Sequence, residues 1–529
     1  MHAAAFEFRD DDVVPIGHKK ITCHMVFDIK SDLTRKARFV AGGHLTDPPK
    51  DTIFSSVVTR DSVRIAFTLA ALNGLDVLAA DVQNAYLNAP TKEKCYFIAG
   101  AEFGPENKGR PVIIVRALYG LRSSGARWRD HMAATLRDAG FESCKADPHV
   151  WMRKAVKPDG FKYWEYVLCY VDDVLAVSHD PKKILEFLEQ RYTLKAGSVK
   201  APTEYLGAEI RKYTIPGTGK ECWAMSSDLY VKRAVAEVER VLGEKNQSLK
   251  NRVTTPTSSG YRPELDVSPE LDAQNANYYQ GLIGVLRWMV ELGRVDILVP
   301  LAMLSRHLAL PRAGHLEQVL HIFAYLKRYN RSAMVFDDSR PQFDETRFVR
   351  ADWAEFYPDA AEPVAPNAPE LRGEHVSTTC FVDADHAGCH ATRRSQTGII
   401  IFMNRAPILW YSKRQNTVES STFGSEFVAM KTAIEQVEAI RYKLRMMGVP
   451  VDGPTNVFCD NESVFKNSTR PESTLKKKHN AIAYHRTREA QAAGIVRIAW
   501  EDGKSNIADL FTKLLAGPRL RELVSHVLW

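Results

Sequence analysis

The chain has 529 residues, 45% of them hydrophobic and 26% charged, and a formal net charge of +7. This length predicts roughly three or four domains, and the charge permits a polyanionic partner without requiring one. No apolar run approaches membrane-spanning length and no secretory signal stands at the N-terminus, so neither a membrane protein nor a secreted one is expected. The eight cysteines form no CxxC pair, which indicates neither a zinc ribbon nor a disulfide framework and favours a reducing, intracellular setting.

The N-terminal part predicts short strands followed by alternating helices and strands. Residues 1 to about 15 are acidic and patternless, and we expect a frayed lead-in there or the remnant of a longer segment. Two strands, 21–29 and 37–40, flank a predicted turn at Lys30-Ser31-Asp32. Helical spacing of apolar residues predicts a helix over 61–75 and another over 126–140. Between them lies a buried strand over 77–82, which carries one carboxylate, Asp81.

The tetrapeptide Tyr170-Val171-Asp172-Asp173 is the most informative local motif. Apolar strand-forming residues flank it, which predicts a β-hairpin over 161–178 with two adjacent carboxylates at its turn. Adjacent carboxylates repel each other unless cations keep both ionised, and oxygen ligands of this kind suit Mg²⁺. Taken alone, the motif is better explained by a solvated turn. Asp81 makes a metal site the better explanation. If its strand lies next to the hairpin, the two adjacent strands bring three carboxylates to one point.

The second half predicts helices, an irregular segment and then a new α/β pattern. Helices are expected over 228–242, 276–308 and 315–329, and the segment 337–374, rich in proline, alanine and acidic residues, predicts an interdomain linker. From residue 379 the pattern predicts strands over 380–383, 398–403, 408–412 and 456–460, and a long helix over 425–447.

Four carboxylates of this last pattern fall on separate elements: Asp383, Glu426, Asp460 and Asp509. Taken alone, Glu426 is explained by its place in the first turn of the helix, where an acidic side chain complements the helix dipole. Asp385 is ranked below these four, on the expectation that its side chain and that of Asp383 point to opposite faces of the strand.

Five ordered segments resemble the reverse transcriptase of copia-type LTR retrotransposons: 36–43, 81–88, 117–122, 170–173 and 205–210. The resemblance implies a right-hand polymerase of fingers, palm and thumb. It makes Asp81, Asp172 and Asp173 the catalytic, metal-binding triad. Two metals at such a site activate a primer hydroxyl and stabilise the leaving pyrophosphate.

The resemblance also assigns substrate-binding residues. Tyr86 would exclude a ribonucleotide 2′-hydroxyl by its bulk, with a core tyrosine as the alternative. Lys36 and Arg38 would face the nucleotide triphosphate, and a solvated strand edge explains them nearly as well. Tyr119 and Gly120 would lie beneath the template base pair.

One departure follows the Tyr119-Gly120 motif. Ser123-Ser124-Gly125 stands where Gln-Ala-Pro is common in this family. The departure removes no metal ligand but leaves fidelity and nucleotide affinity open.

Four later segments, 381–388, 425–430, 458–463 and 507–513, resemble the ribonuclease H domain that follows copia-type reverse transcriptases. The resemblance makes the four C-terminal carboxylates a catalytic quartet that holds two metals and directs water at the RNA of an RNA–DNA hybrid. His479 and His485 lie in the His-containing segment of that family, where one assists product release; a solvated histidine is the equal alternative. Little base specificity is expected.

The resemblance covers residues 16 to 515 and implies an α/β and α+β multidomain protein. We expect fingers and palm over 16–225, a helical thumb and connection over 226–336, a linker over 337–374 and a ribonuclease H-like domain over 375–520. The tryptophan and arginines of 279–288 and 293–297 would line the duplex or pack in the core. Zinc-knuckle, protease and integrase motifs are absent, which favours the downstream part of a polyprotein.

The function expected from the resemblance is RNA-directed DNA synthesis with degradation of the copied RNA. It implies two Mg²⁺ ions per site, with Mn²⁺ as the alternative metal. The implied partners are an RNA template, a DNA primer, the RNA–DNA hybrid and deoxynucleotide triphosphates, without a membrane. The implied location is intracellular, in a cytoplasmic particle or the nucleus. An inactive element relic, or a domesticated nucleic-acid-binding protein, is the alternative.

Overall fold

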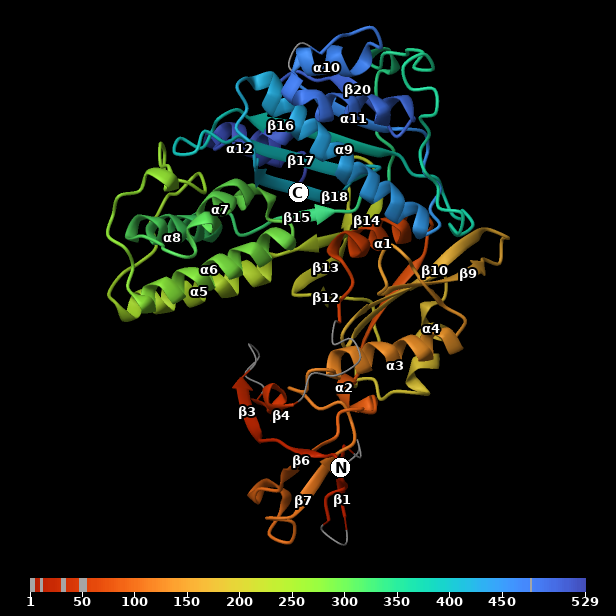
Figure 1. Ribbon diagram of the computed structural model, residues 1–529, viewed down its shortest axis with the longest axis vertical. Coiled ribbons are helices and arrows are strands. Elements are labelled where there is room, and N and C mark those ends of the chain that lie inside the picture. The colour runs from red at the N-terminus through yellow and green to blue at the C-terminus, as the bar shows by residue number, and fades with distance from the viewer. Residues whose placement is uncertain (1–4, 10–12, 30–34, 47–54, 476–477) are drawn as a thin grey trace. The chain divides into compact units, whose positions relative to one another are not determined.

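The computed structural model describes residues 5–9, 13–29, 35–46, 55–475 and 478–529, and Figure 1 labels its elements. The chain forms two compact units, one made of Met1–Ser62 and Leu75–Ala201 and the other of Val63–Gly74 and Pro202–Trp529. These units do not coincide with the four predicted segments, whose boundaries stay a prediction. In the described parts of the chain, no helix combines the length and apolarity that a membrane span requires.

The first unit contains an antiparallel five-stranded sheet in the order β5-β11-β10-β9-β8. Its strands are β5 (Asp76–Asp81), β8 (Glu142–Ser143), β9 (Val150–Val156), β10 (Lys162–Tyr170) and β11 (Asp173–Ser178). Two helices, α3 (Ser124–Asp138) and α4 (Pro181–Glu189), contribute Leu136 and Leu188 to a core with Val167 and Val174 of the sheet. The predicted hairpin, its turn and the strand carrying Asp81 are confirmed.

A smaller sheet of the same unit has the order β1-β7-β6-β2, and β3 pairs with β4 as a separate hairpin. The elements here are β1 (Phe6–Phe8), β2 (Lys19–Lys20), β3 (Cys23–Ile29), β4 (Arg35–Ala41), η1 (Gly43–Leu45), α2 (Ala85–Asn88), β6 (Cys95–Ile98), η2 (Ala101–Phe103) and β7 (Pro111–Ile114). The prediction of a patternless lead-in was wrong for Phe6–Phe8, which pairs with β7. The ring of Phe6 packs edge-on against Phe39 and Phe97, with centroids 5.8 and 5.5 Å away. The predicted turn at Lys30-Ser31-Asp32 lies outside the described residues.

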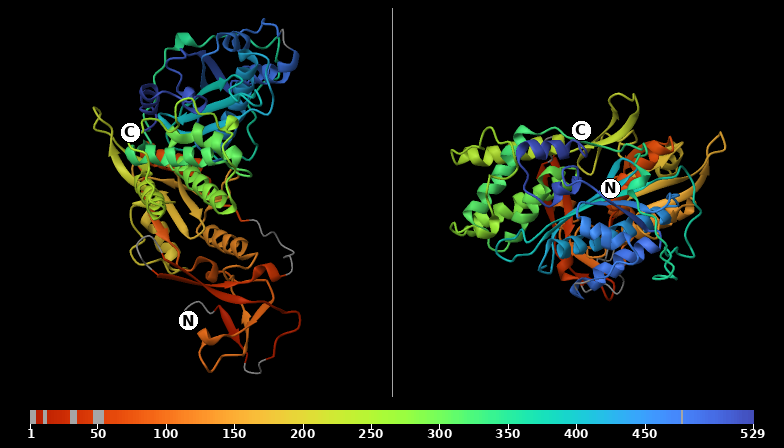
Figure 2. Two further views of the ribbon diagram at one scale, coloured as in Figure 1. Left: turned by 90° about the vertical axis from the view of Figure 1, so that its left-hand side faces the viewer. Right: turned by 90° about the horizontal axis from the view of Figure 1, so that it is seen from above.

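The second unit begins with a four-stranded sheet, β12-β13-β14-β15, and a group of helices. The elements are β12 (Glu204–Tyr205), β13 (Ala208–Thr214), β14 (Glu221–Ser226), α5 (Asp228–Glu244), η3 (Pro263–Leu265), α6 (Ala273–Glu291), η4 (Val295–Ile297), α7 (Leu298–Leu304), η5 (Ser305–His307), α8 (Ala313–Arg328) and β15 (Ala333–Val335). Figure 2 shows the green helices of this group packed side by side.

The single helix predicted over 276–308 is divided. It breaks after α6 because Gly293 adopts a φ of 108°, which a helix cannot accommodate. Helix α1 (Arg60–Leu72) is shared between the units, and its Phe67 stacks on Phe336 of the second one.

The rest of the second unit is built on a mixed sheet in the order β18-β17-β16-β19-β20. The elements are β16 (Thr378–Asp385), β17 (Gln396–Met403), β18 (Ala406–Arg414), α9 (Thr422–Met446), β19 (Thr455–Cys459), α10 (Glu462–Thr469), η7 (Lys478–Asn480), α11 (Ala481–Ala492), β20 (Val496–Trp500), η8 (Ile507–Phe511) and α12 (Gly517–Val524). Helix α9 packs against β16 and β17 (Figure 1). Because β16 and β19 are parallel neighbours, their carboxyl ends lie at the same edge.

The segment predicted as a linker packs against this mixed sheet. Within it, residues 343–362 form what we call the strap, whose one regular element is η6 (Glu345–Arg347). The rings of Phe343 and Phe348 lie 5.0 and 5.9 Å from that of Phe458. Glu362 accepts hydrogen bonds from Arg441 of α9 at 2.8 and 2.7 Å. Composition therefore predicted the irregular backbone, but tertiary contacts hold that backbone in place.

Candidate catalytic sites

The first carboxylate group lies where β5 and β11 meet. Asp81, the last residue of β5, is the cross-strand partner of Asp173, the first residue of β11. Asp172 occupies the turn before β11, and its carbonyl accepts a hydrogen bond from Val82 N at 2.8 Å. Val171 adopts a left-handed φ of 56°, and its carbonyl accepts a 2.6 Å hydrogen bond from Trp128 Nε1. Trp128, which the sequence did not single out, thus supports the turn.

Cations surround this group. Lys195 Nζ lies 3.4 Å from Asp81 Oδ2, and no sequence pattern had pointed to this lysine. Burial and the charge of Asp81 raise the pKa of Asp172, whereas Lys36 and Lys195 lower it. Among the described residues, the ligand atoms of the triad are not within 4.8 Å of one another, unlike those of the second group. Lys195 therefore supplies positive charge next to the carboxylates of Asp81 and Asp172. A divalent cation would neutralise these two charges more fully.

Two aromatic rings border the first group. The rings of Tyr86 and Tyr119 lie 5.0 Å apart, and burial followed by the nearby charge of Asp172 raises the pKa of both. Arg38 lowers the pKa of Tyr119, which places its positive charge on the same side. The structure therefore brings the predicted Tyr86, Tyr119 and Lys36 into the electrostatic neighbourhood of Asp172, and Arg38 into that of Tyr119.

Gly120 is required by a close approach of two backbones. It adopts a φ of +92°, and a Cβ there would lie 2.1 Å from Ala41 O. Tyr119 O accepts a 2.7 Å hydrogen bond from Ala41 N, and a Cβ on Gly43 would lie 2.0 Å from Gly120 O. These contacts join the end of β4 to the loop carrying Tyr119, so the segments 36–43 and 117–122 depend on each other.

The second carboxylate group lies at the carboxyl ends of β16 and β19. Asp383, Glu426 and Asp460 each place one carboxylate oxygen within 4.8 Å of the others. Asp383 is 1% exposed and Glu426 is 8% exposed, so their charges are largely withdrawn from water. Burial and the neighbouring carboxylates raise the pKa of Glu426 well above its usual range and that of Asp460 to about 6. Such a site favours a bound divalent cation.

Lys513 partly compensates these charges. Its Nζ contacts Asp509 Oδ1 and lies 3.3 Å from Asp383 Oδ2. Burial opposes the ammonium charge, but Asp383, Asp509 and Asp460 together raise the pKa of Lys513. Arg519 Nη2 also lies 3.7 Å from Asp509 Oδ2. The structure thus brings Asp509 to the rim of the group, held by two cations, while the other three carboxylates converge.

Comparison with known proteins identifies the first of these regions. Residues 11–239 match the family model described as reverse transcriptase (RNA-dependent DNA polymerase). This part of the chain is similar to reverse transcriptases. The chain is 25% identical, over 98% of its length, to the retrovirus-related Pol polyprotein from transposon RE1 of Arabidopsis thaliana, and 25% identical, over 95%, to that from transposon TNT 1-94 of Nicotiana tabacum. The chain spans about a third of the length of these curated relatives.

The chain is similar to these Pol polyproteins over nearly its whole length, in agreement with the copia-type motifs of the sequence. The foamy viral protease-reverse transcriptase in complex with an RNA/DNA hybrid is 12% identical, with a TM-score of 0.43, over 91% of this chain and 50% of that one. LC11-RNase H1 in complex with an RNA/DNA hybrid is 14% identical, with a TM-score of 0.22, over 26% of this chain and 94% of that one. The mixed α/β fold class predicted from the sequence is confirmed by the sheets described above.

The expectation that the side chains of Asp385 and Asp383 point to opposite faces of the strand was wrong. Asp383 and Asp385 are two residues apart on β16, and side chains at that spacing share a face of the strand. Asp385 is half-buried beside Asp383, whose charge adds to burial in raising the pKa of Asp385, while Arg262 lowers it. Asp385 therefore borders the acidic cluster.

The two predicted histidines contact other residues than the convergent carboxylates of the second group. His479 Nε2 is 3.4 Å from Glu419 Oε2, and Glu419 precedes α9. His485 on α11 shares a 2.9 Å hydrogen bond between its Nδ1 and Tyr357 of the strap. A role in product release stays a prediction, and the geometry gives His485 a structural contact.

Gly398 of β17 lets η8 approach the mixed sheet. A Cβ at this position would lie 2.6 Å from Thr512 Cγ2 and 2.9 Å from Ala508 O. Thr512 in turn donates a hydrogen bond to Asp383 Oδ2. The absence of a side chain at Gly398 thus helps to bring Asp509 and Lys513 to the cluster.

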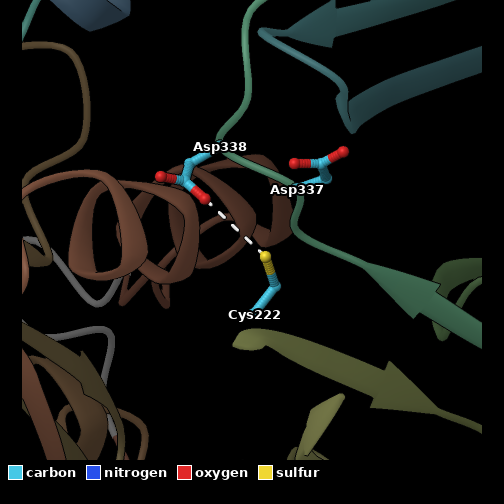
Figure 3. A group of neighbouring side chains, drawn as sticks. All are labelled: Cys222, Asp337 and Asp338. Atoms are coloured by element: carbon cyan, nitrogen blue, oxygen red, sulfur yellow. Dashed lines mark hydrogen bonds between the residues drawn. The ribbon is translucent and has the colours of Figure 1, made fainter. Parts of the chain in front are cut away.

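A third group of side chains that could hold a metal contains none of the residues named above: Cys222, Asp337 and Asp338 (Figure 3). Cys222 Sγ lies 3.6 Å from Asp338 Oδ1, and burial raises the pKa of this thiol to about 11. Lys220 Nζ lies 2.8 Å from the same carboxylate oxygen. Because a protonated thiol and a lysine already serve Asp338, we interpret the group as an ion pair that joins β14 to the chain after β15.

Proposed function

We propose that the chain is an RNA-directed DNA polymerase that also degrades the RNA strand of its RNA–DNA product. The observation that carries this proposal is the register of Asp81 opposite Asp173, with Asp172 in the adjoining turn, inside the reverse transcriptase domain. The convergent carboxylates of Asp383, Glu426 and Asp460 support the second activity. The location in a cytoplasmic particle or the nucleus rests on the relationship to Pol polyproteins alone.

In the proposed polymerase, Asp81, Asp172 and Asp173 hold Mg²⁺, with Mn²⁺ as the alternative. When bound, the metals lower the cost of charge on the attacking and leaving oxygens. Lys36 and Arg38 face the triphosphate, and the pair Tyr86 and Tyr119 supports the sugar and the template base pair. Asparagine cannot replace aspartate at these three positions, because electrostatic stabilisation of the transition state is the largest contribution to the rate of catalysis.

In the proposed nuclease, Asp383, Glu426, Asp460 and Asp509 hold the metals and position water for attack on a phosphodiester. The carboxylate oxygens of the first three fit a divalent cation, because buried like charges within 4.8 Å need a counter-charge. Lys513 would withdraw from Asp383 when that counter-charge is present, and remain near Asp509.

Primer extension by the purified chain tests the polymerase directly. With an RNA template, a DNA primer, deoxynucleotide triphosphates and Mg²⁺ we expect extension, and with a preformed hybrid we expect RNA fragments. EDTA should abolish both activities. A folded wild-type chain that shows neither activity would favour the relic or the domesticated binding protein.

Tyr86→Ala is expected to admit ribonucleotides while deoxynucleotide incorporation changes little, because the proposed duty of the ring is steric. The measurement is the ratio of kcat/KM for deoxynucleotide and ribonucleotide. Tyr86→Phe, which keeps the bulk, is the matched control and should discriminate like the parent. Unchanged discrimination by the alanine variant would make Tyr86 a packing residue.

Mg²⁺ is expected to stabilise the ribonuclease H-like domain, and more at pH 8 than at pH 5. The pKa of Asp460 is about 6 in the folded chain, above the unfolded value of about 3.9. Its contribution to stability is therefore present below pH 4 and is lost as pH rises through 6, where a metal would restore it. Thermal unfolding with Mg²⁺ or EDTA at both pH values measures this, and Asp460→Asn should remove most of the difference. An equal metal response in that variant would contradict the assignment.

A further inference from the structure

The ribonuclease H-like domain and the helices preceding it enclose a cavity that neither proposed site uses. Its volume is about 510 Å³, and it lies between α6, α7 and η5 on one side and β18 on the other. Helix α7 packs against β18, so the two walls belong to one packed structure within the second unit. The charged side chains that line the cavity are Arg287, Glu291, Arg306, Arg394, Lys413 and Arg414.

Among the described residues, the positive charge that lines this cavity exceeds the negative charge. Its one carboxylate, Glu291, lies 3.7 Å from Arg64 outside the lining. Within the described residues, none of the five cations has a carboxylate oxygen within 4.0 Å, unlike Arg294, Arg441 and Arg497 of the same unit. Burial and the charge of Arg414 lower the pKa of Arg306. Five cations without an acidic partner form a surface that attracts a polyanion.

Arg306 relates this cavity to a second one, which borders the acidic cluster. Arg306 lines both this cavity and a second one of about 170 Å³, which Arg262, Asp385 and Lys513 also line. Lys513 in turn lies 3.3 Å from Asp383.

The strand register also places residues of the two cavities in one row across the sheet. Asp385 is the cross-strand partner of Gln396, and Gln396 is that of Arg414. The side chain of Gln396 accepts a hydrogen bond from Arg306. A single row thus leads from the cations of η5 and β18 to the carboxylates of β16.

We propose that these cations form a track for the backbone phosphates of the hybrid strand that enters the acidic cluster. The proposal rests on the hybrid-cleaving function proposed above and names the surface that presents the strand. No aromatic side chain lines the larger cavity, so the surface offers charge without a stacking platform for bases. Contacts of this kind set register along a strand and carry no base sequence.

The test is binding of a fluorescent RNA–DNA hybrid to the full chain in EDTA, so that cleavage is absent. The variant R287Q/R394Q/K413Q removes three cations from the rim of the track, none of them a proposed metal ligand. We expect its Kd to rise by about 10-fold or more, and the slope of log Kd against log salt to fall by between about 2 and 3. The matched control is K250Q/K431Q/K466Q, which removes the same charge from lysines paired with Glu317, Glu435 and Glu462.

An unchanged Kd and salt slope in R287Q/R394Q/K413Q, or an equal loss in the control, would overturn the track. Failure of the wild type to bind the hybrid would overturn it as well. If the wild type binds but does not cut with Mg²⁺, and only the track variant loses binding, the track stands and the proposed nuclease fails. Circular dichroism establishes that each variant is folded.

Discussion

Asp172→Asn is expected to lower primer extension by about 100-fold or more while hybrid cleavage continues. The substitution keeps the shape of the turn after β10 but removes one of three negative charges beside Asp81 and Asp173. Catalysis of phosphoryl transfer depends mainly on positioning and on charge neutralisation, so a lost charge reduces the rate more than a lost contact would. The matched control is Asp159→Asn, an exposed aspartate in the β9–β10 turn.

Asp460→Asn is expected to do the reverse, abolishing RNA degradation while primer extension continues. Asp460 follows β19 in the second unit, whereas Asp172 belongs to the first. Its control is Glu462→Gln, only two residues away on α10, whose carboxylate is exposed and paired with Lys466.

Paired primer extension and hybrid digestion on each variant give the readout, with circular dichroism to confirm folding. If either substitution removed both activities from a folded chain, the two sites would not be independent.

Glu362→Gln is expected to lower the free energy of unfolding of the second unit by about 3 kcal/mol. Glu362 binds the side chain of Arg441, which is 3% exposed, and also lies 2.5 Å from Arg445. Removing the carboxylate charge leaves the buried guanidinium of Arg441 without its counter-ion, and that is the costly outcome for a buried pair. Urea unfolding followed by circular dichroism gives the difference between variant and parent.

The strap itself supplies the control for this measurement. Glu345 pairs with Arg497, but its side chain is 62% exposed, so Glu345→Gln should cost less than about 1 kcal/mol. Equal losses from the two substitutions would mean that the strap is held by its backbone and apolar rings alone. A loss from Glu362→Gln near zero would mean that Arg441 finds another partner.

The sequence by itself determined the local features and the chemistry of the sites. The turn at Val171 and Asp172, the strand that ends in Asp81 and the helix that begins near Glu426 all follow from short patterns of apolar and turn residues, which act over a few positions. The shared face of Asp383 and Asp385 was also within reach of the sequence, because it depends only on the two-residue period of a strand.

Only the tertiary structure decided which distant groups meet. Three such contacts join segments far apart in the chain: Asp81 pairs with Asp173, Lys195 lies beside Asp81, and Lys513 lies beside Asp383. The contact between Lys513 and Asp509 is local, but it depends on the direction that the long lysine side chain takes. The strap has a linker-like composition, yet Glu362 and Arg441 hold it against α9. Burial and charge neighbourhood are properties of the packed chain, so pKa values, counter-ions and the cationic track could not be predicted from local patterns.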